Sequence, residues 1–477
     1  MLRINLPKKE INTFYAFSEE VPSEEYCRGL ACYVARNLKP EIWKKAVSQN
    51  TRTYCLGKCY SSPSSSSYDE KPIIQNKSRE SILLKYMIKE NSNIKDYLAL
   101  GGFKSMEYAL TSMSQKEIID EVDKSFLRGR GGAGFPTGKK WLSVFNQKEK
   151  ERYLIVNADE GDPGAFSDRF LMEYSPHLVI EGSIISAYAI GAKKIYFYIR
   201  REYPKSIFRI KNAILEIKHY FEGKLKLPDI LVEVGKGSYV SGEETAMINA
   251  IMGRRPEPMQ RPPFPTERGL FGKPTVVNNV ETISNIPYIV ENGGKKYYEL
   301  GFSKSRGTKL ISLNSLFNEP GLYEVEFGIT LDDIVYKIGG GLKKGKLTGV
   351  LIGAPFSGVV KPDELNTRLG YEELKEINAS LGHGNIIAFN DETKIGDLLH
   401  EILLFSSYES CGKCTPCRVG TKRLEEIFSK GYVSLNELDE VNDIVYALRK
   451  SSLCGLGTGT GETVNTFLLK YRDEVIK

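Results

Sequence analysis

The sequence predicts an α/β protein that continues into a small mixed region and a helical C-terminal region. Three observations support this fold class. Between residues 150 and 290, short runs rich in β-branched and aromatic residues alternate with helical patterns, which is typical of an α/β sheet. Between 308 and 360, strand-like runs predominate, and from 393 onward apolar residues recur at helical spacing.

The elements are expected in the following order. Helical spacing predicts two or three helices between 80 and 125. In the α/β region we expect strands at 153–156, 195–199 and 230–234, and helices at 178–190 and 206–219. In the mixed region we expect strands at 309–313, 321–325 and 350–352. A small helical bundle is expected from the patterns at 395–405, 423–428, 435–448 and 463–471.

Composition excludes several classes of protein. Of 477 residues, 41% are hydrophobic and 26% are charged, which excludes wholesale disorder and fibrous repeats. The net charge of +6 is too small over this length to indicate nucleic-acid binding. The longest weakly charged run, 182–192, is too short to span a membrane. The amino terminus lacks the features of a secretory signal, so we expect a cytoplasmic location with reduced thiols.

All eight cysteines fall into two groups of four. The C-terminal group is Cys411, Cys414, Cys417 and Cys454. Two successive C-x2-C steps hold three thiolates around one point, and a distant fourth closes the site, as a [4Fe–4S] cluster requires. Tetrahedral zinc sites usually pair two separated C-x2-C hooks, so the spacing favours the cluster over zinc.

The N-terminal group is Cys27, Cys32, Cys55 and Cys59. Four thiolates suffice for a [2Fe–2S] cluster, but the spacing is not that of plant-type ferredoxins. Zinc or plain buried thiols explain this spacing as well, and on spacing alone these alternatives stay open.

A glycine-rich stretch, 127–141, contains a G-x-G-x-x-G pattern formed by Gly129, Gly131 and Gly134. A helical pattern precedes it, not a strand, so the ordinary dinucleotide fingerprint fails, and the spacing also differs from a Walker loop. Such glycines let backbone N–H groups and nearby cations approach a phosphate or a ring, although a flexible loop is the alternative. The cations of this stretch are Arg130, Lys139 and Lys140.

Three further segments are candidates for ligand binding. The polar turn 157–164 follows a predicted strand, where open α/β sheets bind ligands. Glu243 and Glu244 would suit ribose hydroxyls or a flavin ring edge, with an exposed helix start as the alternative. Arg261 and Phe264 place a cation and a ring on a proline scaffold, which a rigid surface loop explains nearly as well.

The four histidines are expected to be structural. No G-x-S-x-G elbow accompanies them, so a hydrolase triad has little support. They are His177, His219, His383 and His400.

Six motifs, taken together, resemble a known family. They are 129–141, 157–164, 239–245, 261–265, 272–282 and 409–421. In this order they resemble the NADH-binding flavoprotein subunit of respiratory complex I and its relatives, the diaphorase subunits of NAD-linked hydrogenases and formate dehydrogenases. The resemblance covers about residues 80 to 477.

The resemblance implies two bound nucleotides and no catalytic side chain. NAD(H) would stack against Phe135 and Phe264, with polar contacts from Lys140, Asp162, Glu244 and Arg261. FMN would be held by Gly129, Arg130, Gly131, Gly132, Ala133, Gly134, Asn157, Asp159, Glu160, Tyr239, Gly242, Glu243, Asn278, Asn279 and Thr282.

The resemblance also implies a domain order. In addition, it favours the [2Fe–2S] interpretation of the N-terminal cysteines more strongly than their spacing alone does. The serine-rich stretch 61–68 has no apolar periodicity and predicts a flexible linker. The expected parts are a shortened thioredoxin-like [2Fe–2S] segment (1–62), the linker (63–80), a Rossmann-like FMN/NADH-binding domain (81–302), a β-grasp, ubiquitin-like domain (303–392) and a four-helix [4Fe–4S] bundle (393–477).

Three positions depart from the family pattern. Asp162 stands where Glu is common and Arg261 where Lys is common, so a 2′-phosphate is tolerable and NADP(H) is not excluded. After Cys454, residues 458–462 differ from the sequence that usually follows this cysteine in the family. The surroundings of the Cys454 thiol are therefore not predicted.

The sequence therefore predicts an oxidoreductase, an NAD(P)H dehydrogenase or diaphorase subunit, that exchanges hydride between NAD(H) and FMN and passes single electrons to a [4Fe–4S] cluster. The N-terminal segment favours a soluble formate dehydrogenase or hydrogenase over the NADH-oxidising subunit of complex I. Expected partners are the other redox subunits of such a complex, with neither nucleic acid nor membrane insertion. A non-enzymatic zinc-binding scaffold is the alternative from another class.

Overall fold

The computed structural model describes residues 24–49, 53–68, 70–87 and 92–477. The amino-terminal residues used to predict the absence of a secretory signal lie outside these ranges. Among the described residues, no helix combines the length and the apolar composition needed to cross a bilayer.

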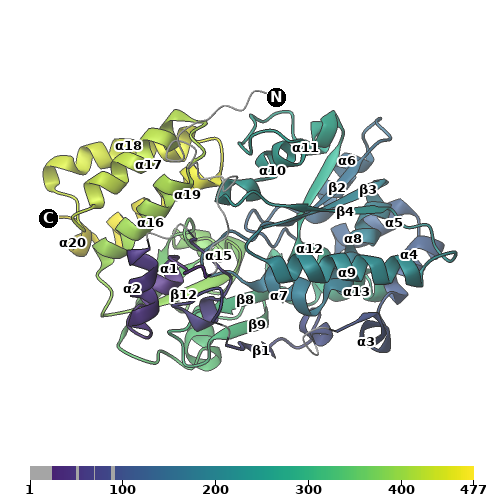
Figure 1. Ribbon diagram of the computed structural model, residues 1–477, viewed down its shortest axis with the longest axis horizontal. Coiled ribbons are helices and arrows are strands. Elements are labelled where there is room, and N and C mark those ends of the chain that lie inside the picture. Colours follow the sequence, from purple (N-terminus) through teal and green to yellow (C-terminus); the bar gives the residue numbers. More distant parts are fainter. Residues whose placement is uncertain (1–23, 50–52, 69, 88–91) are drawn as a thin grey trace.

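A four-stranded parallel sheet forms the middle of the chain (Figure 1). The predicted strands at 153–156, 195–199 and 230–234 are confirmed, and a fourth strand joins them. Alternate residues of these strands point to opposite faces, and both faces are buried. The strands are β2 (Tyr153–Ala158), β3 (Lys194–Ile199), β4 (Asp229–Val234) and β5 (Thr275–Asn279).

Helices cover both faces of this sheet. On one face, α8 (Pro176–Ile190) packs on β2 and β3, and α9 (Pro204–Tyr220) packs on β4. Proline occupies the first turn of both helices, and α8 ends at Gly191 with a positive φ of 71°, as expected for helix starts and stops. On the other face, Met247 and Ile248 of α10 (Glu244–Ile251) pack against the sheet.

The strand order β4-β3-β2-β5 creates a crevice at one edge of the sheet. The chain runs outward from β2 to β3 and β4, then returns to the opposite side of β2 with β5. The loops that follow β2 and β5 therefore leave in opposite directions, and open α/β sheets bind ligands at such a point. Asn157 and Asn279 are partners in register at this edge.

A second, six-stranded sheet follows along the chain, in the order β1-β9-β8-β12-β10-β11. It confirms the strands predicted at 309–313, 321–325 and 350–352. A strand from the N-terminal part of the chain, β1, adds to its edge in parallel with β9. The strands are β1 (Ile73–Asn76), β8 (Thr308–Leu313), β9 (Gly321–Glu326), β10 (Leu347–Ile352), β11 (Val359–Val360) and β12 (Asn385–Asn390).

The prediction of a flexible serine-rich linker is wrong. Ser61, Ser62, Ser64 and Ser65 are buried, and the Oγ atoms of Ser62 and Ser315 lie 2.8 Å apart. The stretch has few apolar groups, but Ser62 Oγ donates to the Cys59 carbonyl and Ser65 Oγ donates to Glu24, which allows burial without an apolar side chain. Ser61 Oγ has no hydrogen-bond partner among the described residues.

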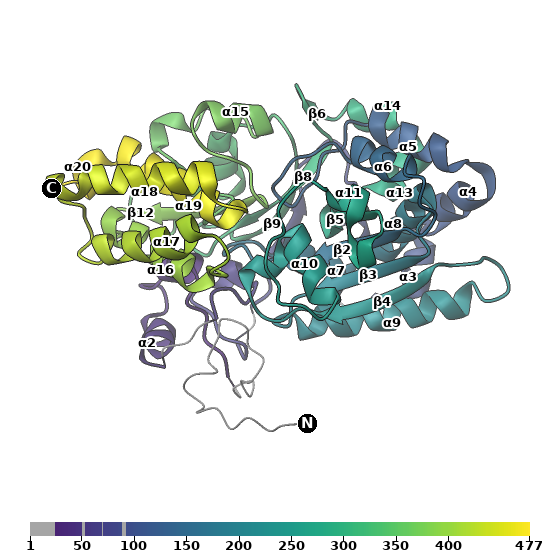
Figure 2. The ribbon, with the colours of Figure 1, turned by 90° about the horizontal axis from the view of Figure 1, so that it is seen from above.

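Four C-terminal helices pack together at one end of the molecule (Figure 2). They confirm the predicted helical C-terminal region. These helices are α16 (Ile395–Glu409), α17 (Thr415–Phe428), α18 (Leu438–Ser451) and α19 (Gly455–Lys470). The remaining α-helices are α1 (Leu30–Val34), α2 (Pro40–Ser48), α3 (Ile94–Ala99), α4 (Lys104–Ser112), α5 (Gln115–Lys124), α6 (Thr137–Phe145), α7 (Ser167–Tyr174), α11 (Pro265–Arg268), α12 (Val280–Ser284), α13 (Ile286–Asn292), α14 (Gly294–Tyr298), α15 (Tyr371–Glu376) and α20 (Arg472–Val475). A short hairpin is formed by β6 (Gly301–Phe302) and β7 (Ser305–Arg306).

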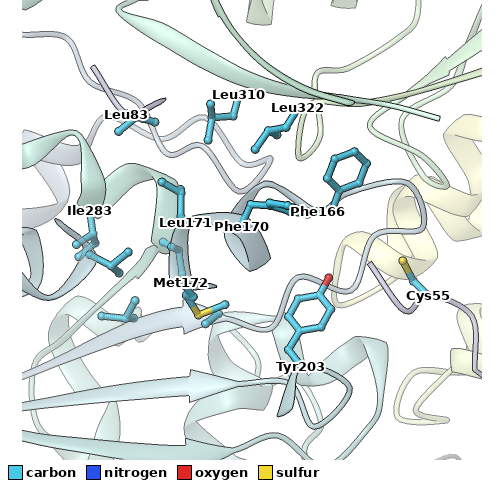
Figure 3. Close-up of a cluster of buried hydrophobic side chains, with 14 of the residues drawn as sticks. Cys55, Leu83, Phe166, Phe170, Leu171, Met172, Tyr203, Ile283, Leu310 and Leu322 are labelled. Atoms are coloured by element: carbon cyan, nitrogen blue, oxygen red, sulfur yellow. The ribbon is translucent and has the colours of Figure 1, made fainter. Parts of the chain in front are cut away.

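One hydrophobic core joins the two sheets. Phe170 and Leu171 of α7 point toward Leu310 of β8 and Leu322 of β9 (Figure 3). The same interface contains a fully buried ion pair between Lys309 and Glu281 of α12, and Glu281 Oε1 also accepts a hydrogen bond of 3.0 Å from the Leu310 N–H. A buried pair of this kind is costly to break from one side.

We expect Lys309→Met to lower the free energy of unfolding by about 3–5 kcal/mol, because it leaves the Glu281 carboxylate buried without a cation. Chemical denaturation of the full chain would measure this. Lys337→Met is the matched control, since Lys337 pairs with Asp333 on the surface and its loss should barely change stability. Equal effects of the two substitutions would contradict the role assigned to the buried pair.

Candidate functional site

A cavity of about 730 Å³ lies where β2 and β5 end, a volume typical of small-ligand sites. Five of the six motifs singled out in the sequence meet there. The predicted residues that line it are Gly129, Gly131, Ala133, Phe135, Lys140, Asn157, Asp159, Asp162, Tyr239, Gly242, Glu243, Glu244, Arg261, Phe264, Asn278 and Asn279. The predicted residues outside the lining are Arg130, Gly132, Gly134, Glu160 and Thr282.

The glycine-rich loop connects α5 to α6, so a helix precedes it, as predicted. The Arg130 N–H donates a 2.8 Å hydrogen bond to Thr282 Oγ1, which ties the loop to α12. A Cβ at Gly131 would lie 3.0 Å from the Cβ of Asn279, so glycine permits this close approach to the end of β5.

The Arg130 side chain points away from the cavity, although the sequence suggested a cation at the ligand. It is fully buried and donates hydrogen bonds of 2.9 Å to Tyr297 Oη and 2.7 Å to the Arg306 carbonyl. The guanidinium therefore holds the loop from the side opposite the cavity, and Arg130 is not part of the cavity lining.

The polar turn after β2 contributes the acidic wall of the cavity. Asp162 Oδ1 accepts a 2.7 Å hydrogen bond from Tyr239 Oη, and Asn157 Nδ2 donates one of 2.8 Å to the Gly242 carbonyl. Asp159 Oδ2 is buried without a hydrogen-bond partner among the described residues, and burial raises the pKa of Asp159 to about 8. This carboxyl group is suited to meet a donor from a ligand.

The Glu160 side chain does not line the cavity. Its carboxylate accepts hydrogen bonds of 3.0 and 3.1 Å from the backbone N–H groups of Asp168 and Arg169 at the start of α7. Tyr203 Oη lies 3.2 Å from Glu160 Oε2. The side chain thus satisfies the first turn of a helix, where a negative charge is favoured.

Two adjacent glutamates and two cations form a network in the cavity. Glu243 caps α10 by accepting hydrogen bonds from the Thr245 and Ala246 N–H groups, while burial raises its pKa. Glu244 lies 2.8 Å from Arg261 Nη1 and 3.4 Å from Lys140 Nζ. Both cations are therefore already paired with a carboxylate.

Two aromatic rings belong to the same cavity. Phe135 and Phe264 line it, yet about half of each side chain is exposed, at 52% and 50%. Exposed rings in a cavity wall offer apolar faces on which a planar ligand ring can stack.

The C-terminal cysteines converge beside this cavity. Cys414 caps the start of α17, Cys417 lies within it, and Cys454 caps the start of α19. Cys411 packs in one buried cluster with Cys454. Cys454 also lines the cavity, so the cysteine group and the cavity share a wall.

The N-terminal cysteines are all buried and form a second group. The Sγ atoms of Cys55 and Cys59 lie 3.8 Å apart, and the Gly29 N–H donates to Cys27 Sγ. The neighbouring Cys59 thiol, helped by Arg200, lowers the pKa of Cys55 to about 6. Four thiols in one buried place, one of them acidic, can hold a metal centre.

The main residue that the sequence analysis missed is His383, which was assigned a structural role but lines the cavity. It precedes β12, far along the chain from the other lining residues. A single histidine in a turn has no periodicity or spacing that would reveal its surroundings. The other lining residues outside the predicted set are Lys139, Ser143, Gly161, Val240, Pro265, Thr266, Glu267, Thr275, Val277, Gly455 and Leu456, while Cys454 was predicted as a cluster ligand and not as part of the nucleotide site.

Comparison with known proteins identifies both the cavity region and the C-terminal cysteine region. Residues 122–288 match the Nuo51 FMN-binding domain, and residues 397–477 match the NADH-ubiquinone oxidoreductase-F iron–sulfur binding region. An NADH-quinone oxidoreductase subunit of Aquifex aeolicus is 41% identical over 422 residues, 86% of this chain and 96% of that protein. NADP-reducing hydrogenase subunit HndC of Solidesulfovibrio fructosivorans is 40% identical over 398 residues, 80% of this chain and 81% of that protein.

A solved structure is similar over nearly the whole chain. It is a crystal structure of an NAD⁺-reducing [NiFe]-hydrogenase in the H₂-reduced state, one chain of which aligns with a TM-score of 0.83 at 27% identity. The alignment covers 97% of this chain and 85% of that one. The mixed α/β fold with a parallel sheet is confirmed by this similarity.

The buried Asp159 carboxyl group should make stability depend on pH. Its pKa is raised in the folded chain, so the unfolded chain loses this proton first, and the free energy of unfolding falls as the pH rises from about 4 to about 8. We expect Asp159→Asn to match the parent chain at pH 4 and to be more stable by about 1–3 kcal/mol at pH 9. Denaturation of the ligand-free protein at both pH values would measure this. Asp333→Asn is the control, because Lys337 lowers the pKa of Asp333 and its loss should give no gain at pH 9.

Proposed function

The chain belongs to the family of NADH-oxidising FMN and iron–sulfur subunits that is found in NADH-quinone oxidoreductases and related hydrogenases, and we propose that it is the diaphorase subunit of a soluble NAD-linked formate dehydrogenase or hydrogenase. Family membership confirms the predicted oxidoreductase activity, the FMN, NAD(H) and [4Fe–4S] cofactors and the assembly with other redox subunits. The scaffold hypothesis is not retained, because the family is one of oxidoreductases.

One observation supports the assignment of the cavity as the FMN and NAD(H) site. Cys454 of the C-terminal cysteine group lies in the cavity wall, so a ligand there is next to the residues proposed to hold the cluster. The donor set also fits a flavin nucleotide. The glycine-rich loop offers backbone N–H groups, and Asp159 Oδ2 and Glu243 Oε1 are buried acceptors without hydrogen-bond partners among the described residues.

When bound, FMN would accept a hydride from the nicotinamide and give up its electrons one at a time. The chain supplies position and surroundings. We assign the stacking of planar rings to Phe135 and Phe264, and the orientation of ribose hydroxyls to Glu244, which Lys140 and Arg261 hold in place. Cys411, Cys414, Cys417 and Cys454 would hold the cluster that accepts these electrons.

We assign the N-terminal cysteines to a [2Fe–2S] centre. Their burial and mutual proximity support this, as does the docking of their loop on two cations. Arg200 Nη2 donates a 3.0 Å hydrogen bond to the Cys55 carbonyl, and Arg169 Nη1 donates one of 3.0 Å to the Gly57 carbonyl. Residues 24–68, where described, contain two short α-helices, one 3₁₀ turn (Cys59–Ser61) and no strand, so the proposed thioredoxin-like relationship applies to a much shortened segment.

The proposed division of the chain follows the two sheets and the helix bundle. We place the FMN/NADH-binding unit at 81–302, a β-grasp unit at 303–392 and the [4Fe–4S] bundle at 393–477. Strand β1 lies outside the β-grasp range but extends its sheet through β9. The segment 63–80 is therefore proposed as part of this unit and not as a separate linker.

Two kinds of partner complex remain distinct proposals. The hydrogenase structure aligns with 97% of this chain, which favours a hydrogenase-type or formate dehydrogenase complex. The alternative, an NADH-oxidising subunit of complex I, is supported by the 41% identity to the Aquifex aeolicus protein. Affinity purification from the native cell decides between them, since it recovers a nickel, molybdenum or tungsten subunit in one case and membrane-arm subunits in the other.

We expect Cys454→Ser, made in the full chain and purified without oxygen, to lose about four iron atoms per chain while keeping its flavin. NADH should still bleach the flavin band, but the electron paramagnetic resonance spectrum of the reduced [4Fe–4S] cluster should disappear. Iron analysis and visible spectroscopy measure both outcomes. If the parent chain binds no flavin, or if NADH leaves the flavin band unchanged, the proposed function is wrong.

Cys55→Ser tests the N-terminal centre and serves as the reciprocal control. This variant should lose about two iron atoms per chain and keep the other four together with the flavin. Recovery of zinc in place of iron in the parent chain, or an unchanged iron content in the variant, would contradict the [2Fe–2S] proposal.

A further inference from the structure

His383 stands apart from the other histidines because it faces the cavity while almost fully buried. Its exposed fraction is 7%, and it belongs to the cavity lining. Nε2 lies 2.9 Å from Asp168 Oδ2. Within the described part of the chain, Nδ1 makes no hydrogen bond. One ring nitrogen is thus held by a carboxylate, and the other is available to a ligand.

Three carboxyl groups act on this imidazole. Glu160 Oε1 lies 3.5 Å from Nε2. Burial alone would lower the pKa of His383, but the charge and hydrogen bond of Asp168, followed by the charges of Glu160 and Asp162, raise it to about 9. Beyond these, Arg200 donates to the Glu160 carbonyl and Tyr203 to its carboxylate. His383 is therefore an imidazolium at neutral pH.

The arrangement of Glu160, Asp168 and His383 also resembles a metal site, but its oxygen atoms are already used. Glu160 accepts two backbone N–H groups at the start of α7. Asp168 accepts from the Glu281 N–H at 3.2 Å and from Asn279 Nδ2 at 2.5 Å. A proton on His383 satisfies this cluster, whereas a divalent cation would have to displace these N–H donors.

The position of His383 places it beside a feature that favours a phosphate. The preceding residue, Gly382, contacts the glycine-rich loop, since a Cβ at Gly132 would lie 3.6 Å from the Gly382 Cα. Backbone N–H groups of such loops are common partners of phosphate groups.

Apart from His383, the cations of the cavity are either paired or exposed. Asp159, Asp162, Glu243 and Glu244 line the wall, Lys140 and Arg261 are paired with Glu244, and Lys139 is exposed. A phosphate monoester adds a charge of nearly −2 at neutral pH. A phosphate dianion placed among these carboxylates requires a positively charged group with a hydrogen-bond donor that no carboxylate has already taken.

We propose that His383 is a cationic ligand of the FMN phosphate, to which it donates Nδ1–H, and that Asp168 is the residue that positions it. This inference rests on the proposed function, because it takes FMN as the ligand of the cavity. It adds a phosphate ligand on the segment before β12, outside the glycine-rich loop and the end of β5.

The test compares FMN with riboflavin, which has the same ring and lacks the phosphate. The full chain is freed of flavin, and each flavin is titrated while its fluorescence is followed. For His383→Asn we expect the dissociation constant of FMN to rise about tenfold at pH 7, the effect of losing one charge-assisted hydrogen bond, while that of riboflavin changes less than about twofold. His219→Asn is the matched control, since this side chain is 91% exposed at the end of α9.

The parent chain provides a second test that needs no substitution. Between pH 7 and pH 10 the phosphate stays dianionic, so a loss of FMN affinity near pH 9 that is absent for riboflavin reports the loss of the His383 proton. His383→Asn should abolish this pH dependence. Iron content and circular dichroism show whether the variant is folded.

Three outcomes would overturn the inference while leaving the proposed function intact. They are an unchanged FMN dissociation constant in His383→Asn, an equal loss of affinity for both flavins, and a stoichiometric divalent metal ion other than iron that the substitution removes. Failure of the parent chain to bind either flavin would instead contradict the proposed function itself.

Discussion

The position of β5 is the constraint on which the site depends. Because β5 returns to the far side of β2, the segments that follow these two strands diverge and cannot cover the edge between them. Hydrogen bonds hold two segments of the cavity wall relative to that edge. The glycine-rich loop is tied to α12 through Thr282, and Asn157 fixes the Gly242 carbonyl from β2. A different strand order would separate the same residues along this edge of the sheet.

Buried charged groups fix the position of this sheet edge relative to the rest of the molecule. Lys309 and Glu281 join the second sheet to α12, Glu160 satisfies the start of α7, and Arg200 bonds both the Glu160 carbonyl and the Cys55 carbonyl. Each charge has a partner, which makes the arrangement tolerable in a low-dielectric interior. Because hydrogen bonds between charged groups are directional, they fix the relative position of parts that apolar packing alone would allow to slide.

Much of this architecture could be predicted from the sequence, and the failures have physical causes. The strands β2 and β3 were predicted because strands buried on both faces are continuous apolar runs. The edge strand β4 is partly exposed, but its Ile-Leu-Val run still has the β-branched and apolar composition of a strand. Strand β5 is polar at its end, where Asn278 and Asn279 serve the cavity, so its pattern is weak. The serine-rich stretch was assigned wrongly because its composition shows that apolar groups are scarce. Composition does not show that the folded chain offers hydrogen-bond partners to these serines. The orientation of Arg130 and the exposure of His383 to the cavity depend on residues distant in sequence, which no local pattern contains.

The placement of the two cysteine groups gives the N-terminal segment a physical role under the proposed function. A hydride brings two electrons at once, whereas an iron–sulfur centre accepts one. The C-terminal group reaches the cavity through Cys454. The N-terminal group approaches the turn after β2, because Arg200 bonds both the Glu160 carbonyl and the Cys55 carbonyl. A second acceptor held near the cavity would allow the second electron to leave without waiting for the first to pass to a partner. The burial of the serine-rich stretch then has a reason, since a flexible linker would not keep the N-terminal cysteine group at a fixed distance from the cavity.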